Sequence, residues 1–452
     1  MIFNLKTILL SVCTFFIVSV HTPLIAKEIR SAKPEKHGFS TQRLDRITQF
    51  MNEQVSNGTM VGGYGLIARN GKIIYAQDYG FASRKLQNKI NQDTIFRIYS
   101  MTKPIVSVAL MMLYEEGKFL LDDPIAKYIP ELANLHVAVT TADVQNQADD
   151  IKSSLNSMSK NSSVGKTRIA KVQPTIRDLL RHTAGFTYGI FGTTEVDKLY
   201  LKSNLMNAST LKEFVTKLGK LPLQYDPGSQ WHYSIAVDVQ GYLIEVLSGK
   251  KLSLFLEEKI FKPLDMKDTF FLIPSHKEHR LAELYQPENY NPKEGFLSRT
   301  IQKGLKVADS NQSARYYDTT TFEMGGAGLL SSTRDYLRFC QMLLNGGVLD
   351  GKRILSPKTI QLMTINQLKG VFSWFNEKMG FGLGFGVITD LTSINTTSSI
   401  DTYFWGGAAG TKFWIDPHEN LIGIFMVQSL PHKTDLSTHF QNLSYQALIK
   451  SN

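Results

Sequence analysis

At residues 96–104 the chain reads Phe96-Arg-Ile-Tyr-Ser100-Met-Thr-Lys103-Pro104. Apolar side chains then recur at helical spacing, which predicts a helix that begins near Ser100 and stops at Gly117. A serine and a lysine three positions apart at the start of a helix project from the same face, one turn apart. The apolar positions are Ile105, Val108, Ala109, Met112 and Leu113.

A serine beside a lysine is one way to build a nucleophile. An isolated serine hydroxyl reacts poorly and needs a neighbouring base. A lysine amine, with an ordinary pKa of about 10.4, can serve if burial and nearby charges lower that pKa. The start of a helix also provides a positive field that favours an oxyanion nearby. We therefore take Ser100 as the candidate nucleophile and Lys103 as its proton acceptor.

The spacing alone is not specific, because five Ser-x-x-Lys matches occur. Two of them lie in a polar stretch that offers nothing to hold them. Ser209 precedes a capping box, and Ser248 ends a helix, where the dipole has the wrong sign for an oxyanion. Only Ser100 heads a strongly apolar helix, with Pro104 in the tolerated first turn. The five matches are Ser100–Lys103, Ser157–Lys160, Ser163–Lys166, Ser209–Lys212 and Ser248–Lys251.

Strand patterns occur near both ends of the chain. Tyr64–Arg69 and Lys72–Asp78 flank an Asn-Gly pair, the strongest short-range hairpin signal. Thr411–Ile415 and Leu421–Gln428 flank a second turn, and a helical pattern covers Ser234–Leu247. We expect the strands from both ends to pair into one antiparallel sheet. The predicted fold class is α/β (α+β), with a helical lobe built from the middle of the chain.

Three segments are expected to lie outside this body, which we place at residues 36–450. Residues 1–26 read as a secretory signal peptide, with an uncleaved membrane anchor as the alternative. No later run is long enough to cross a bilayer. The polar stretch 140–171 predicts a mobile insertion. Residues 274–318, polar with aromatic interruptions, predict either surface decoration or a roof over the site.

The composition excludes several classes of protein. A net charge of +10 without a block of consecutive like charges favours a basic solvated surface over nucleic-acid binding. Of the two cysteines, Cys13 lies in the predicted signal, so Cys340 has no partner for a disulfide or a cysteine metal site. His-Glu-x-x-His, Gly-x-Ser-x-Gly and phosphate-loop motifs are missing. We expect no metal and no cofactor.

The motifs, taken in order, resemble those of the serine β-lactamase and penicillin-binding-protein-like superfamily. The stretch Phe96–Pro104 resembles the nucleophile motif of class C β-lactamases, and more closely that of their family VIII carboxylesterase relatives. Pro227-Gly-Ser-Gln-Trp231-His-Tyr233 resembles the second element, whose tyrosine follows a Pro-Gly turn and opens a helix. Thr175–Gly185 and Gly325–Leu337 match further landmarks. The resemblance covers roughly residues 40–430 and implies a β-lactamase/transpeptidase-like fold.

The resemblance also implies a role for each motif residue. Ser100 would form an acyl-enzyme, Lys103 would help to deprotonate it, and the Tyr233 phenol would relay a proton to the leaving group and later activate water. Tyrosine and lysine both have ordinary pKa values near 10, so when packed together they share one labile proton. His182, in His-Thr-Ala-Gly, is expected to hold a loop by hydrogen bonding, because no Asp–His pair indicates a triad.

The third family element is usually Lys-Thr-Gly or His-Thr-Gly, and the matching stretch here is Trp405-Gly406-Gly407-Ala408. The resemblance implies that Ala408 N–H joins Ser100 N–H in an oxyanion hole, and that Trp405, Gly406 and Gly407 line the substrate site. In β-lactamases and D,D-peptidases the cation helps to receive the substrate carboxylate, and an indole cannot replace that charge. This departure favours the esterase branch.

We therefore expect an exported serine hydrolase, periplasmic or secreted, most simply a carboxylesterase on short-chain esters or small amides. Two alternatives stay open: a penicillin-recognising β-lactamase or D,D-peptidase, and a non-catalytic binding protein with this fold. The intact Ser100, Lys103 and Tyr233 oppose the second. The expected partner is a small ester, amide or β-lactam. Nucleic acid, and stable membrane insertion after processing, are not expected.

Overall fold

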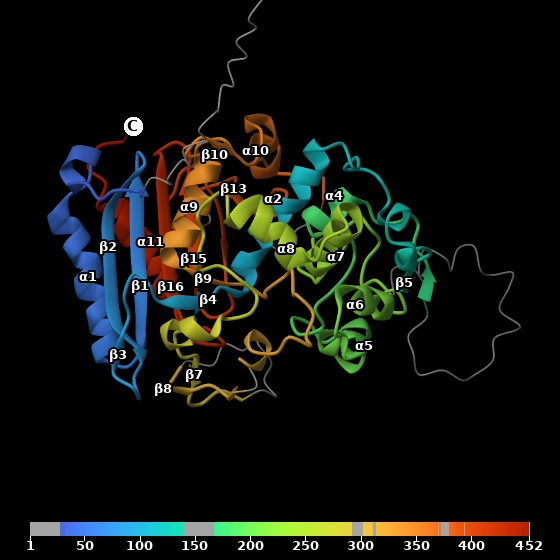
Figure 1. The fold of residues 1–452 in the computed structure, drawn as a ribbon, viewed down its shortest axis with the longest axis horizontal. Coiled ribbons are helices and arrows are strands. Elements are labelled where there is room, and N and C mark those ends of the chain that lie inside the picture. Colours follow the sequence, from blue (N-terminus) through green and yellow to red (C-terminus); the bar gives the residue numbers. More distant parts are fainter. Residues whose placement is uncertain are drawn as a thin grey trace, which may run out of the picture.

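The computed structural model describes residues 28–139, 167–291, 302–310, 313–368, 370–371, 379–392 and 394–451. The predicted signal peptide and the 140–166 part of the predicted insertion lie outside these residues. Figure 1 shows a sheet-containing lobe beside a lobe of helices, with the first and last helices of the chain on the same outer side of the sheet. Among the described residues, no helix combines the length and apolar character needed to span a bilayer.

The larger lobe is built on an eight-stranded antiparallel sheet. β1 and β2 form the predicted hairpin, and Asn70 and Gly71 between them have φ values of 52° and 68°, as a tight two-residue turn requires. β1 also pairs with β16, from Gly63 opposite Val427 to Arg69 opposite Leu421. The predicted pairing of both chain ends is confirmed. In spatial order the strands are β12 (Met379–Phe381), β13 (Gly386–Ile388), β14 (Tyr403–Gly406), β15 (Lys412–Asp416), β16 (Leu421–Val427), β1 (Gly62–Arg69), β2 (Lys72–Ser83) and β3 (Asn88–Lys89).

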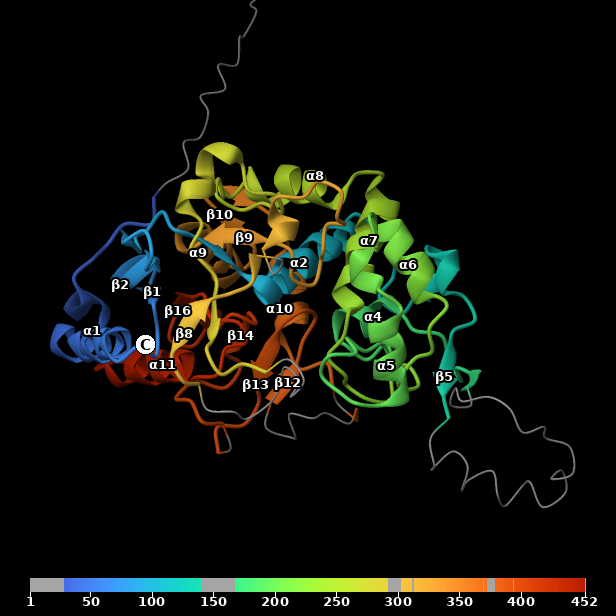
Figure 2. The same ribbon diagram turned by 90° about the horizontal axis from the view of Figure 1, so that it is seen from below.

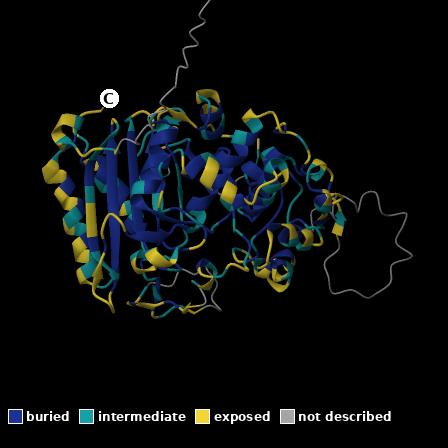
Figure 3. Ribbon diagram, viewed as in Figure 1, coloured by how far each residue is buried: buried dark blue, intermediate teal, exposed yellow. Residues whose placement is uncertain are grey.

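Helices cover both faces of the sheet (Figure 2). On the outer face, α1 (Thr41–Ser56) and α11 (Leu436–Gln446) share an apolar cluster with the strands, in which Trp414 and Phe440 lie with ring centroids 5.8 Å apart. The inner face carries α9 (Thr333–Leu344), which contacts β15 and β16. Because both faces are covered, β1 and β16 are buried along their whole length (Figure 3).

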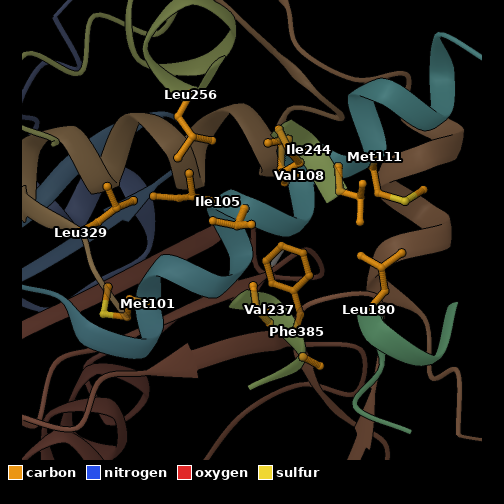
Figure 4. Packing of buried hydrophobic residues seen from close by; sticks show 14 of the residues in the cluster. Met101, Ile105, Val108, Met111, Leu180, Val237, Ile244, Leu256, Leu329 and Phe385 are labelled. Carbon is orange, nitrogen blue, oxygen red and sulfur yellow. The ribbon is translucent and has the colours of Figure 1, made fainter. Parts of the chain in front are cut away.

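The central helix α2 (Thr102–Glu115) joins the sheet to the helical lobe. Its side chains pack against α7 (Ala236–Ser248), as Figure 4 shows for Ile105, Val108 and Met111 beside Val237 and Ile244. Nearly every α2 side chain is buried, which explains why the sequence is apolar on more than one face. The other helices of this lobe are α4 (Ile176–Leu180), α5 (Glu195–Lys202), α6 (Leu211–Leu218) and α8 (Leu252–Leu256).

Smaller elements complete the described chain. The short pairs are β4 (Ile95–Arg97) with β9 (Leu330–Ser332), β5 (His136–Ala138) with β6 (Thr167–Ile169), β7 (Tyr285–Pro287) with β8 (Leu305–Val307), and β10 (Val348–Leu349) with β11 (Lys352–Arg353). The remaining helical segments are α10 (Pro357–Thr364), η1 (Pro34–His37), η2 (Tyr99–Met101), η3 (Ile125–Lys127), η4 (Pro130–Leu132), η6 (Leu205–Asn207), η7 (Glu257–Phe261), η8 (Ser275–Arg280) and η11 (Ala314–Tyr316).

One prediction on a surface segment needs correction, and for a second segment the structure removes one of two alternatives. β6 lies within the predicted 140–171 insertion and is paired, so that segment is structured from residue 167 on. The 274–318 stretch is not mere decoration, because Tyr285 and Tyr316 are only 4% and 1% exposed. Tyr285 packs with Val61 and Leu305, and Tyr316 packs with Ile95 of β4 and Leu330 of β9. Their aromatic rings, not the polar neighbours, decide where this stretch lies.

Asp335 is a buried carboxylate in the first turn of α9. Its Oδ2 accepts hydrogen bonds from the Asp268 N–H at 2.6 Å and from the Thr269 hydroxyl at 2.9 Å. Burial nevertheless raises the pKa of Asp335 from 3.8 to about 6, and the charge of Asp268 acts in the same direction. The folded protein therefore holds this proton more tightly than the unfolded chain does.

We expect Asp335→Asn to remove a pH-dependent part of the free energy of unfolding. This carboxyl is protonated in both states below about pH 4, so its full contribution is present there and is lost as the pH rises through about 6. A shift of roughly two pKa units is worth about 3 kcal/mol. Between about pH 3 and 7.5, urea unfolding should show the wild type losing about 3 kcal/mol more than the variant. Exposed Asp45→Asn is the control, and equal pH dependence of wild type and Asp335→Asn would refute the assignment.

Candidate active site

Ser100 lies in the short turn η2, between β4 and the first residue of α2. The predicted helix is confirmed, but it begins at Thr102, so the serine stands just ahead of it. Tyr99 has a φ of +43°, a left-handed conformation that is strained for a side chain of this size. The turn is fixed by bonds from distant segments, among them Tyr336 hydroxyl to Met101 carbonyl at 2.9 Å. The serine is therefore presented on a rigid turn and is only half-buried.

Lys103 is 1% exposed, and its amine is held by two hydrogen bonds. Its Nζ donates to Ser100 Oγ at 3.1 Å and to the Gly326 carbonyl at 2.7 Å. The same nitrogen lies 4.6 Å from the ring centroid of Tyr233 and 5.2 Å from that of Tyr188. Aromatic faces attract an ammonium group, so the two rings would stabilise the positive charge that the amine gains when it accepts a proton. The predicted Ser–Lys contact is thus present in the folded chain.

Gly326 links the lysine to a buried acid. Its carbonyl accepts from Lys103, and its N–H donates to Asp238 Oδ1 at 2.9 Å. Asp238 is fully buried, and burial raises its pKa while the Lys103 charge opposes that rise. A Cβ on Gly326 would lie 2.7 Å from Asp238 Oδ2 and 2.8 Å from the Tyr188 hydroxyl, so this position needs glycine. The backbone of Gly326 therefore forms a hydrogen-bonded bridge between the Asp238 carboxyl group and the Lys103 amine.

Tyr233 lies three residues before α7, inside a group of rings. It stacks on Trp231 with centroids 6.2 Å apart and planes inclined by 13°, and it contacts His182 at 5.0 Å. The ring reaches the Lys103 amine, as predicted. No hydrogen bond joins the Tyr233 hydroxyl to Ser100 or Lys103 among the described residues. Catalytic hydrogen bonds are often long before substrate binds, so the predicted proton relay through the Tyr233 hydroxyl stays a prediction.

His182 holds the segment that carries Tyr233, in agreement with its predicted loop role. Its carbonyl accepts from His232 N–H at 2.9 Å, and its Nδ1 accepts from Ser234 N–H at 3.4 Å. The residue adopts a left-handed φ of 57°. Burial holds the pKa of His182 well below its usual value, and the nearby Lys103 charge adds to this. The neutral imidazole of His182 accepts a backbone hydrogen bond and so fixes the segment that carries Tyr233.

The third sequence element closes against the nucleophile turn. A Cβ on Gly407 would lie 2.5 Å from the Ile98 carbonyl, which explains why glycine stands here. Trp405 contacts Tyr233 at 5.4 Å and Phe381 at 5.2 Å, and its Nε1 finds no acceptor among the described residues. The structure thus brings Trp405, Gly406 and Gly407 to the site. The oxyanion hole from the N–H groups of Ser100 and Ala408 stays a prediction.

Sequence reasoning missed four contributors: Tyr188, Phe191, Asp238 and Gly326. Asp238 lay within the predicted helix Ser234–Leu247 and Gly326 within the Gly325–Leu337 segment, but neither residue was given a role. A carboxylate on the apolar face of a predicted helix was the available signal for Asp238, because such a group needs a buried partner. Nothing in the local pattern singled out Tyr188 or Phe191. Among the described residues, no cluster of three His, Cys, Asp or Glu side chains could hold a metal ion.

The fold and the Ser–Lys pair define a class: serine hydrolases with a β-lactamase/transpeptidase fold. A profile of the Beta-lactamase family matches residues 45–446. The chain therefore belongs to the Beta-lactamase family and is a hydrolase of that family.

Three known proteins show the range of its relatives. Esterase EstB of Burkholderia gladioli is 28% identical over 385 residues, which cover 82% of this chain and 86% of EstB. An Escherichia coli K12 protein, whose name proposes D-alanyl-D-alanine carboxypeptidase activity, is 28% identical over 426 residues, 89% of this chain and 86% of that protein. The structure of EstCE1, described as a hydrolase with promiscuous acyltransferase activity, is similar with a TM-score of 0.68 and 25% identity, covering 90% of this chain and 99% of EstCE1.

Proposed function

We propose that this protein is an exported carboxylesterase that forms an acyl-enzyme on Ser100. One observation carries the proposal: the Lys103 amine lies 3.1 Å from the Ser100 hydroxyl and is fixed there by the Gly326 carbonyl. A base within hydrogen-bond reach of a half-exposed hydroxyl is the arrangement that activates serine. Export rests on the sequence of residues 1–26, which lie outside the described part.

In the acylation step, Ser100 Oγ attacks the ester carbonyl carbon and its proton passes to the neutral amine of Lys103. The Gly326 carbonyl accepts an N–H from this amine before and after the transfer, so the amine keeps its place as it becomes charged. The face of the Tyr233 ring, 4.6 Å away, then favours the ammonium form. The carbonyl oxygen becomes negative, and the N–H groups of Ser100 and Ala408 would stabilise it.

In the second half of acylation, the Tyr233 hydroxyl gives its proton to the leaving alkoxide and recovers one from Lys103. The C–O bond of the ester breaks, the alcohol leaves, and the acyl group stays on Ser100 Oγ. Water then attacks the acyl carbon, with Tyr233 and Lys103 taking its proton, and Ser100 Oγ leaves as it receives a proton from the Lys103 amine. The ring contact keeps Tyr233 beside Lys103, and the exchange itself requires the Tyr233 hydroxyl to close on the amine when substrate binds.

Trp405 favours an ester over a substrate with a free carboxylate next to the reacting bond. An indole offers a face and one N–H but no positive charge, so it cannot form the ion pair that a lysine or histidine would form. The esterase relative EstB supports this choice. A penicillin-recognising enzyme is the second candidate, favoured by the similarity to the Escherichia coli protein with the carboxypeptidase name.

A trapping experiment separates the candidates. Purified protein is mixed with short-chain nitrophenyl esters, small amides and penicillins, quenched in acid, and examined by mass spectrometry of its peptides. We expect an acyl group from the esters on the peptide that carries Ser100, and none in Ser100→Ala. Labelling of Ser100 by penicillins alone would assign the protein to the second candidate. Ester turnover without any acyl group on Ser100 in rapid-quench samples would refute the acyl-enzyme.

A further inference from the structure

Four partly exposed aromatic rings lie together beside the reacting groups. Phe191 contacts Tyr188 at 5.5 Å and Tyr233 at 5.7 Å, while Tyr233 contacts Tyr188 at 5.4 Å and Trp405 at 5.4 Å. Each of the four is half-buried, so each keeps part of its ring open. Two of them come from the loop between α4 and α5, far in sequence from Ser100. We call this set the aromatic wall.

The loop that carries Tyr188 and Phe191 is clamped by one buried carboxylate, that of Asp197. Its Oδ1 accepts from the Thr187 hydroxyl at 2.7 Å, and its Oδ2 accepts from Thr194 N–H at 3.0 Å and from the Thr194 hydroxyl at 2.8 Å. Asp197 is 2% exposed. The Asp197 carboxylate therefore accepts hydrogen bonds from both ends of the segment 187–194. Because it is buried, water does not compete for these hydrogen bonds.

The Asp197 carboxylate can lie under this loop only because residue 192 is a glycine. A Cβ there would lie 2.2 Å from Asp197 Oδ2, so any side chain at residue 192 would displace the acid or the loop. The chain thus places glycine where the acid reaches back under the loop, one residue after Phe191. Loop conformation and ring position are coupled through this contact.

The clamp continues to the residue next to Tyr233. The Thr187 hydroxyl gives its only proton to Asp197 and accepts from Gly189 N–H at 3.1 Å. His232 Nε2 lies 3.2 Å from the same hydroxyl and therefore donates to it. Burial lowers the pKa of His232, which keeps the ring neutral. Asp197, Thr187 and His232 thus tie the loop to the segment that presents Tyr233.

We propose that the aromatic wall is a subsite for a planar apolar group on the alcohol side of the ester, with Phe191 as its specificity-determining residue and Asp197 as the positioning residue. This rests on the proposed function and extends it to a substrate class, arylmethyl esters. The alcohol side is assigned because Phe191 packs on Tyr233, the group that hands a proton to the leaving oxygen. Aromatic rings in contact gain free energy beyond simple burial, which a saturated ring of equal size does not share.

The test compares two matched pairs of esters. Benzyl acetate and cyclohexylmethyl acetate carry a planar and a saturated six-membered ring on the alcohol, and methyl phenylacetate and methyl cyclohexylacetate carry the same two rings on the acyl side. Rates of alkaline hydrolysis of each ester correct for their different intrinsic reactivity. We expect the wild type to prefer benzyl over cyclohexylmethyl acetate by about tenfold in kcat/KM, mainly through KM. The acyl pair should show little preference. A preference confined to the acyl pair would overturn the assignment.

Phe191→Leu keeps apolar volume but removes the ring. It should abolish the preference for benzyl over cyclohexylmethyl acetate, whereas Phe191→Trp should retain that preference. An unchanged preference in Phe191→Leu would contradict the subsite.

Asp197→Asn and Gly192→Ala test the clamp. Both should lose the benzyl preference while fluorophosphonate still labels Ser100 at the wild-type rate. Asp178→Asn is the matched control, because Thr175 and Asp178 form the same capping box at the start of α4. Asp178→Asn should lower the free energy of unfolding without changing the ratio of kcat/KM for benzyl acetate to kcat/KM for cyclohexylmethyl acetate. An equal loss on both acetates in Asp197→Asn would refute its positioning role, and the absence of any ester hydrolysis or labelling would instead refute the proposed function.

Discussion

Ser100→Ala is expected to lower kcat for hydrolysis of a short-chain nitrophenyl ester by at least about 10⁴-fold. The reason is geometric. The Lys103 amine is 1% exposed and is fixed by the Gly326 carbonyl against a single side-chain hydroxyl, that of Ser100. Without that hydroxyl the base has no nucleophile to activate, and the residual rate should be that of water in a site that still binds substrate.

The chain supplies a matched control for this substitution. Ser209 and Lys212 have the same spacing at the start of α6, but both are exposed. Ser209→Ala should therefore hydrolyse the ester at the wild-type rate. Circular dichroism of both variants checks the fold. A Ser100→Ala protein that kept more than about a tenth of wild-type kcat would remove Ser100 from the reaction.

Lys103→Met is expected to lower kcat by about 10³-fold with a much smaller change in KM. Methionine keeps an unbranched apolar chain of similar length, so the packing between α2 and α7 is retained. What disappears is the amine that accepts the Ser100 proton and is held over the Tyr233 ring. The Gly326 carbonyl also loses its donor, so a modest loss of stability should accompany the loss of rate.

Two readouts distinguish chemistry from folding in this variant. A fluorophosphonate probe should label Ser100 far more slowly in Lys103→Met than in the wild type, although thermal unfolding remains cooperative. Lys212→Met, at the exposed Ser-x-x-Lys match, should behave as wild type in both assays. Equal labelling rates for Lys103→Met and wild type would show that another group deprotonates the serine.

The parts of the fold that could be predicted depend on short-range patterns. The Asn70-Gly71 turn fixed the first hairpin, because both residues adopt the left-handed conformation that this turn needs. Helical periodicity located α2 and α7 to within a few residues. The Ser100–Lys103 contact followed from one turn of helix, a local geometry that the rest of the protein does not have to create.

The remainder could not be predicted because it depends on long-range packing. Asp238 and Gly326 meet only when α7 lies against the segment before β9. Phe191 reaches Tyr233 only because the Asp197 carboxylate fixes its loop, and no periodicity reports that contact. The burial of Tyr285 and Tyr316 within the 274–318 stretch was not predicted, for the same reason. Their polar neighbours suggested surface, while their rings fill spaces made by strands elsewhere in the chain.

The direct pairing of β1 with β16 has a consequence for how the molecule is made. During synthesis the β1–β2 hairpin emerges first, and the strand that completes its hydrogen bonding follows only far later in the chain. Until then β1 keeps an open edge, and such unsatisfied edges promote aggregation or chaperone binding. Contacts between such distant parts of a chain also slow folding, and the native sheet cannot form before β16 has been synthesised.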